Sequence, residues 1–109
     1  MALGIILKAL SNPIRRDIIA RLRERDMTAG ELADAYSVSK PTMSTHFAAL
    51  KEAGLIEGRR DGVVIHYSLN ATVAEEALAA LMQLLGTSDE RLPLTAEPGE
   101  TNLKTDQKS

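Results

Sequence analysis

The chain has 109 residues, of which 44% are hydrophobic and none is cysteine. This length and composition suit one small domain with a modest core, and they exclude disulfide bonds and thiolate metal sites. The formal net charge of −2 is unevenly distributed, with 10 basic and 8 acidic residues in 1–70 but 3 and 7 in 71–109. The apolar runs are too short to span a membrane and no secretory signal pattern is evident, so we expect a cytoplasmic protein without membrane insertion.

Two helices are expected before residue 26. The first covers residues 2–10, and its apolar stripe needs cover from the domain itself or from a second subunit. The stripe consists of Leu3, Ile6, Leu7 and Leu10. Asn12 followed by Pro13 is typical of a helix start, because a capping residue precedes a proline in the first turn. The second helix is therefore predicted to run from Pro13 to about Arg25.

The next segment carries the signals of a helix-turn-helix. Thr28 and Glu31 form a capping-box pattern that begins a short third helix, which ends near Tyr36. After a tight turn, Ser39 begins a fourth helix with Pro41 in its first turn, where a missing N–H group costs nothing. Two helices joined by such a turn are typical of a helix-turn-helix.

The fourth helix, residues 39–50, has two unlike faces. Apolar residues recur at helical spacing on one face and predict a buried side. The other face is predicted to carry short polar groups suited to base edges and phosphates: Lys40, Thr42, Ser44, Thr45 and His46. No acidic residue occurs from Ala35 to Lys51, which indicates a polyanionic partner. We therefore interpret this segment as a recognition helix for duplex DNA; for His46, a structural or solvent-facing position is the alternative.

A β-hairpin is expected after the recognition helix. Gly54 is placed to end that helix in the left-handed conformation. The segments 55–60 and 63–69 alternate in hydrophobicity around Asp61-Gly62, a hairpin turn signal. A hairpin after a helix-turn-helix is a wing, and Arg59 and Arg60 near its tip would reach a phosphate or the minor groove.

A last helix is predicted from about Thr72 to Leu85, capped by Asn70 or by Thr72. Its apolar positions exceed what one face of a small domain needs, so we expect some of them to form a dimer seam. The seam positions are Leu78, Leu81, Met82 and Leu85. Residues 1–86 would then form one DNA-binding and dimerisation domain, followed by an acidic, disordered tail over residues 87–109.

In this order the elements resemble the ArsR family of winged helix-turn-helix transcriptional repressors. The likeness is carried by four stretches that lie within residues 3–85: residues 8–16, 30–33, 39–51 and 52–56. The metal-independent, SdpR-like subgroup is the most similar. The resemblance implies a mainly α fold with a small β-hairpin, in the order α-α-α-α-β-β-α, and a homodimer held by the first and last helices.

The resemblance also implies a homodimeric repressor that occupies a two-fold symmetric DNA operator, which could include that of its own promoter. Family positions for base and phosphate contacts fall on Ser39, Lys40, Pro41, Ser44, Thr45 and His46, with Arg59 and Arg60 in the wing. Thr42 and Lys51 complete the predicted DNA-contacting set. The dimer residues would be Leu3, Ile6, Leu7 and Leu10 of the first helix, with the seam positions of the last.

Other functions find less support. Thiolate sensors of the family carry cysteines where this chain has Ala33 and Ala35, and residues 72–85 contain neither the Asp nor the His of the other common metal site. We therefore expect no metal and no cofactor. The chain also lacks a phosphate-binding glycine loop and a nucleophile elbow, so we expect no enzyme. Two alternatives stay open: a winged-helix module that binds a protein such as an antirepressor, and a ligand-gated sensor.

Overall fold

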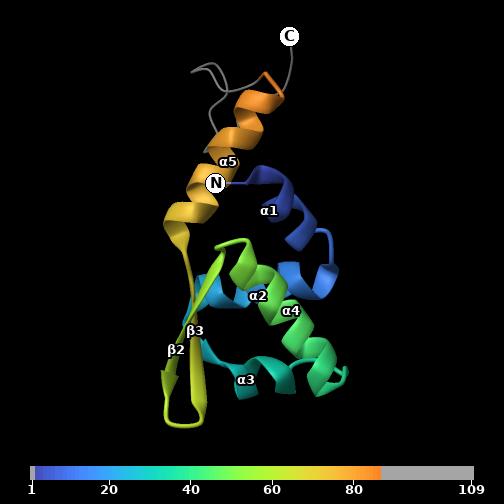
Figure 1. Cartoon of the computed structure of the whole chain (residues 1–109), viewed down its shortest axis with the longest axis vertical. Coiled ribbons are helices and arrows are strands. Elements are labelled where there is room, and N and C mark those ends of the chain that lie inside the picture. Colours follow the sequence, from blue (N-terminus) through green and yellow to red (C-terminus); the bar gives the residue numbers. More distant parts are fainter. Residues whose placement is uncertain (1, 87–109) are drawn as a thin grey trace, which may run out of the picture. The chain divides into compact units, whose positions relative to one another are not determined.

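The computed structural model describes residues 2–86, which belong to two units divided after Leu78. Figure 1 shows the elements in chain order. They are α1 (Leu3–Ala9), α2 (Pro13–Glu24), β1 (Met27–Thr28), α3 (Ala29–Asp34), α4 (Lys40–Glu52), β2 (Ile56–Asp61), β3 (Val64–Leu69) and α5 (Ala71–Leu84). The predicted mainly α, winged helix-turn-helix class is confirmed. The predicted tail lies outside the described residues.

Side-chain caps fix where the helices begin. The Asn12 Oδ1 accepts the backbone N–H groups of Ile14 and Arg15 at 2.8 and 3.1 Å. The capping box before α3 is confirmed, because the Thr28 and Glu31 side chains each accept the other residue's backbone N–H. Asn70 rather than Thr72 caps α5. These bonds satisfy amide groups that have no partner inside the helix.

The sheet has three antiparallel strands in the order β1-β3-β2, so the predicted two-stranded hairpin is incomplete. The short strand β1 pairs with β3, with Met27 opposite Tyr67 and Thr28 opposite His66. Two residues are too few to show the alternation that marks a strand in a sequence. The hairpin turn is also displaced by one residue, because Asp61 pairs with Val64 and leaves Gly62 and Val63 as the turn.

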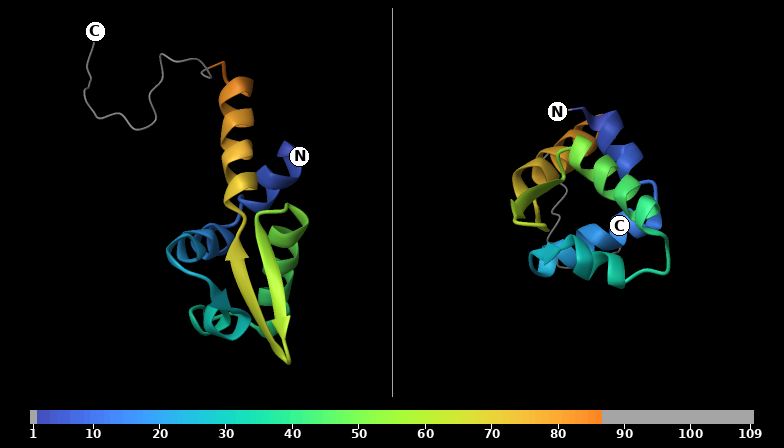
Figure 2. Two further views of the ribbon diagram at one scale, coloured as in Figure 1. Left: turned by 90° about the vertical axis from the view of Figure 1, so that its left-hand side faces the viewer. Right: turned by 60° about the horizontal axis from the view of Figure 1, so that its bottom comes forward.

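The core of the first unit lies where the helices meet one face of this sheet. Helices α2, α3 and α4 gather around that face, and the turn of the hairpin projects beyond them (Figure 2). The largest fully buried side chains are Ile6, Ile18, Leu32 and Leu50. The ring of Phe47 on α4 packs on that of Tyr67 on β3, with 4.8 Å between ring centroids. This packing holds the recognition helix against the wing.

Candidate nucleic-acid interface

The first turns of α4 present a continuous exposed surface without acidic side chains. Ser39 caps the helix by accepting the backbone N–H of Thr42 at 3.3 Å, and proline occupies the first turn. Six of the predicted DNA-contacting residues are exposed there: Ser39, Lys40, Pro41, Thr42, Ser44 and Thr45. The buried side is formed by Met43, Phe47 and Leu50, as the spacing predicts.

Hydrogen bonds within α4 determine what its hydroxyl groups can offer to a ligand. The Ser39 hydroxyl donates to the Thr42 Oγ1 at 2.9 Å, and the Thr45 hydroxyl donates to the Pro41 carbonyl at 3.1 Å. Both hydroxyls therefore retain acceptor capacity only. The Ser44 hydroxyl has no hydrogen-bond partner among the described residues, so it can both donate to and accept from a base edge.

His46 does not share this exposed surface. Its side chain is buried, with 6% of the residue exposed, and its Nδ1 accepts a hydrogen bond from the Arg15 Nε of α2 at 3.1 Å. Burial, and then the nearby Arg15 charge, lower the pKa of His46 below its usual value of 6.5. The prediction that His46 faces DNA is therefore wrong. The helical period places this residue at the edge of the apolar face, and α2 covers that edge.

A polar cluster joins α2 to the end of α3. The Tyr36 hydroxyl donates to the Asp17 carboxylate at 2.5 Å, and the Arg21 Nε donates to both groups at 3.1 and 2.9 Å. These hydrogen bonds and the Arg21 charge lower the pKa of Asp17, while burial and the Asp17 contact raise the pKa of Tyr36 to about 12. The cluster fixes the segment that leads into the recognition helix.

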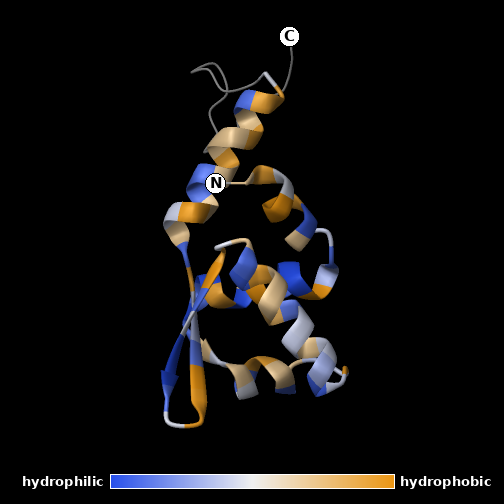
Figure 3. Cartoon of the chain, viewed as in Figure 1, coloured by the Kyte–Doolittle hydropathy of each residue, from blue (hydrophilic) through white to orange (hydrophobic). Residues whose placement is uncertain are grey.

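The two wing arginines lie on opposite faces of the hairpin. Directly opposed residues share a face; Arg60 pairs with Ile65 and Arg59 with His66. Arg60 therefore lies on the face of Ile65 and Tyr67 that meets α4, and Arg59 on the outer face. Figure 3 shows β2 as hydrophilic along most of its length, with hydrophobic residues at the turn and in β3. Val63 at the turn is 93% exposed.

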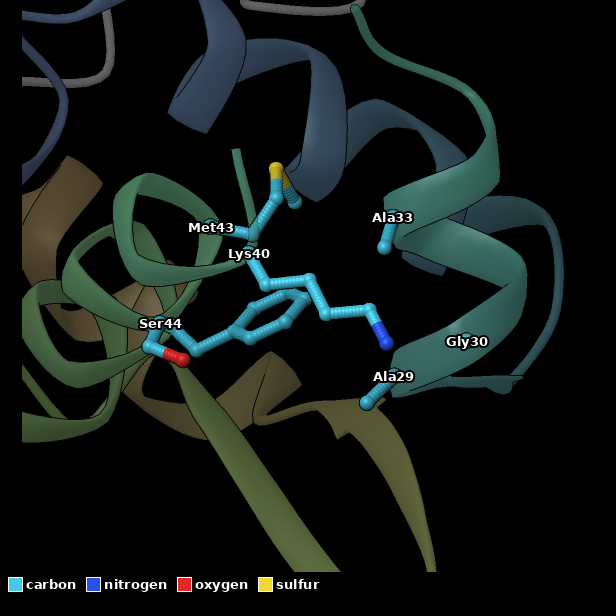
Figure 4. A pocket seen from close by; sticks show the side chains of 7 residues that line it. Ala29, Gly30, Ala33, Lys40, Met43 and Ser44 are labelled. Carbon is cyan, nitrogen blue, oxygen red and sulfur yellow. The ribbon is translucent and has the colours of Figure 1, made fainter. Parts of the chain in front are cut away.

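Two hollows lie beside the recognition helix. The first, about 250 Å³, lies between α3 and α4, and Figure 4 shows the Lys40 side chain extending from α4 towards Ala29 of α3. The second is lined by Ser44 and Lys51 of α4 together with Ile65 and Tyr67 of β3. Lys40, Ser44 and Lys51 therefore share the side of α4 that faces α3 and the wing.

The predicted dimer residues differ in exposure. Ile6 is only 1% exposed and belongs to the core of its own unit, so its assignment to an interface is wrong; α1 packs on α4 and needs Ile6 for that contact. Leu3 and Leu10 are half-buried, while Leu7 and Leu78 are 42% and 47% exposed. In the second unit Leu81 and Met82 are half-buried and Leu85 is 66% exposed. Ile5, which the prediction omitted, is 43% exposed.

Residues 2–86 contain neither a candidate metal-ion cluster nor a helix that could span a membrane. No group of three or more His, Asp or Glu side chains lies close enough together to hold a metal ion. No helix in that range is both long and apolar enough to cross a membrane.

The recognition helix, its supporting α3 and the adjacent wing together define a winged helix-turn-helix DNA-binding protein. Comparison with known proteins agrees: residues 10–59 match the model of a helix-turn-helix domain family. The chain is 39% identical over 87 residues to the transcriptional repressor SdpR of Bacillus subtilis, covering 80% of this chain and 97% of that protein. It is 31% identical over 86 residues to the biofilm growth-associated repressor of Xylella fastidiosa, covering 79% and 75%.

Solved structures show the same relationship. The fold is similar to that of the ArsR-like transcriptional regulator from Rhodococcus sp. RHA1, with a TM-score of 0.68, 28% sequence identity, and coverage of 82% of this chain and 84% of that one. The chain belongs to the ArsR family of winged helix-turn-helix transcriptional regulators. It is a sequence-specific DNA-binding transcriptional repressor and not an enzyme, and the alternative of a protein-binding module is not favoured.

Proposed function

We propose that the protein acts as a homodimer that occupies a palindromic operator and thereby excludes RNA polymerase from a promoter, its own included. Each subunit would place Ser39 to Thr45 in the major groove, with the wing beside it. Two-fold symmetry of the protein would then match half-sites about one helical turn, ~34–36 Å, apart. Such an operator lies in the cytoplasm of a bacterial cell, which we propose as the site of action.

The observation that carries this proposal is the exposed surface of α4 from Lys40 to Lys51, which has no acidic side chain. An ordinary solvent-facing helix mixes charges of both signs, whereas a surface that meets phosphates excludes carboxylates. Ser44 supplies a hydroxyl that is available for a base edge. An antirepressor protein would relieve repression by covering this same surface.

The dimer is proposed from the exposed apolar residues of α1 and α5. Ile5 and Leu7 project from α1, and Leu78 from the part of α5 in the first unit, each more than 40% exposed. Large apolar side chains that gather on short helices mark an interaction surface, and a two-fold interface uses the same patch on both subunits. Replacing Leu7 with Glu should give monomers in analytical ultracentrifugation and weaken operator binding; a persistent dimer would contradict this interface.

DNA binding is tested with a fluorescence-anisotropy titration on the promoter fragment upstream of the protein's own gene. We expect saturable binding that survives an excess of random competitor DNA. Lys40→Ala should weaken binding to every sequence, whereas Ser44→Ala should change the order of preference among operator variants. Arg23→Ala, an exposed arginine on α2, is the matched control and should bind as the unmodified protein does. Equal affinity for the promoter and random DNA would refute the proposed operator.

A further inference from the structure

Arg15 of α2 is a half-buried cation that forms no ion pair with a carboxylate among residues 2–86. Its Nε donates to the His46 Nδ1 at 3.1 Å, which uses one of the five donors of the guanidinium group. Within the described residues the ion pairs are Arg21 with Asp17 and Arg25 with Glu31, and neither includes Arg15. A partly buried charge is costly unless it is paired. Glu52 and Lys8 line the same hollow as Arg15, but Glu52 is in neither of these ion pairs, so the Arg15 guanidinium can take an external anion.

The contact with His46 defines the chemical state of both side chains. Arginine remains protonated in proteins, so the His46 Nδ1 must carry a lone pair and the imidazole must be neutral. His46 is itself held in the interior, with 6% of its surface exposed. It is therefore a rigid acceptor that fixes the plane of the Arg15 guanidinium beside α4 and leaves the two terminal nitrogen atoms available.

Arg15 lies beside the side of the recognition helix that has no cation of its own. Lys40 and Lys51 share the opposite side of α4, towards α3 and the wing, where each lines one of the two hollows described above. Thr42 and His46, four residues apart, lie on the side towards α2. A helix about 10–12 Å across fills a major groove about 12 Å wide, so each side of the helix faces one phosphate backbone.

We propose that Arg15 binds a phosphate of the DNA strand that runs along the α2 side of α4, and that His46 is the positioning residue that orients it. The terminal nitrogen atoms of the guanidinium donate to two phosphate oxygens in the fork geometry that arginine favours. The two backbones of the groove are then held from opposite sides, by Arg15 on one and by Lys40 on the other. This inference rests on the proposed DNA binding by α4.

Arg15→Gln separates a phosphate contact from a structural role, because glutamine can still donate to His46 but carries no charge. The measurement is the operator affinity of the full chain from about 50 to about 200 mM salt. We expect the slope of log affinity against log salt to fall by about 0.9 per subunit, or about 1.8 per dimer. Arg23→Ala, the exposed control on the same helix, should leave the slope unchanged.

The role of His46 is tested with two substitutions. His46→Leu removes the acceptor and should reduce the salt slope as Arg15→Gln does, whereas His46→Asn keeps an oxygen near the position of Nδ1 and should restore it. Thermal melts of each variant identify any loss of folding, and comparison is confined to variants that melt cooperatively. The inference would be overturned if Arg15→Gln kept the salt slope of the unmodified protein. It would also be overturned if His46→Asn reduced the slope by as much as His46→Leu does.

The outcomes distinguish this inference from the proposed function. If the unmodified protein binds the promoter and Lys40→Ala reduces its salt slope while Arg15→Gln does not, α4 binds DNA without Arg15 and only the inference fails. If the unmodified protein binds promoter DNA no more tightly than random DNA, the proposed operator binding fails together with the inference.

Discussion

The two adjacent arginines of the wing offer a matched test of how the hairpin meets DNA. Arg60 shares a face with Ile65 and Tyr67, the face that packs towards α4, whereas Arg59 lies opposite His66 on the outer face. Both are exposed, carry the same charge and differ by one position in the chain. If DNA lies along α4, Arg60→Ala should remove a phosphate contact and Arg59→Ala should not.

The magnitude follows from counterion release. Each phosphate contact contributes about 0.9 to the slope of log affinity against log salt, so a dimer that loses Arg60 from both subunits loses about 1.8. When the salt concentration rises fourfold, from about 50 to about 200 mM, the affinity of both proteins falls. The factor by which it falls should be about tenfold smaller for the variant than for the unmodified protein. Its affinity at low salt should be correspondingly weaker.

The assay is an anisotropy titration of one labelled operator at four salt concentrations. Circular-dichroism melts should show similar stability for both variants, because neither exposed arginine has a hydrogen bond or an ion pair among the described residues. Equal changes in slope for Arg59→Ala and Arg60→Ala would refute the assignment of the two arginines to opposite faces of a DNA-bound wing. A larger change for Arg59→Ala would place DNA on the outer face.

Three further outcomes follow from the structure. Burial and Arg15 lower the pKa of His46, so the unfolded chain binds more protons than the folded chain does just below pH 6.5. The melting temperature should therefore fall as the pH drops below 6.5, and it should fall less in His46→Asn. The pKa of Tyr36 is raised to about 12, and burial raises the pKa of Tyr67. Ultraviolet absorbance should therefore show little phenolate at pH 10, and the free energy of unfolding should decline only as the pH rises from 10 towards 12. Phenolate formation at pH 10 in the folded protein would contradict the environments described for these tyrosines. Gly54→Ala should cost about 1–2 kcal/mol in urea unfolding, because φ is +77° there while an added Cβ would lie 3.8 Å from Val73; a much larger loss would indicate a clash.

The sequence alone was sufficient for features that neighbouring residues control. Asn12, Thr28 with Glu31, and Ser39 mark helix starts, because each cap bonds to amides two or three residues ahead. Gly54 marks the end of α4, since few residues other than glycine readily adopt its left-handed backbone conformation. The helical period located Met43, Phe47 and Leu50 in the core, and the absence of acidic residues from Ala35 to Lys51 indicated DNA.

The tertiary structure decided what depends on residues far apart in the chain. The strand β1 exists because β3 supplies its partners, some 40 residues later. His46 lies at the edge of an apolar face, and the packing of α2 on α4, with Arg15 31 residues earlier in the chain, places it inside the fold. Ile6 likewise belongs to the core because α4 covers it. Which of the two wing arginines faces α4 depends on the pairing of β2 with β3, because a register slip of one residue would exchange the faces of Arg59 and Arg60.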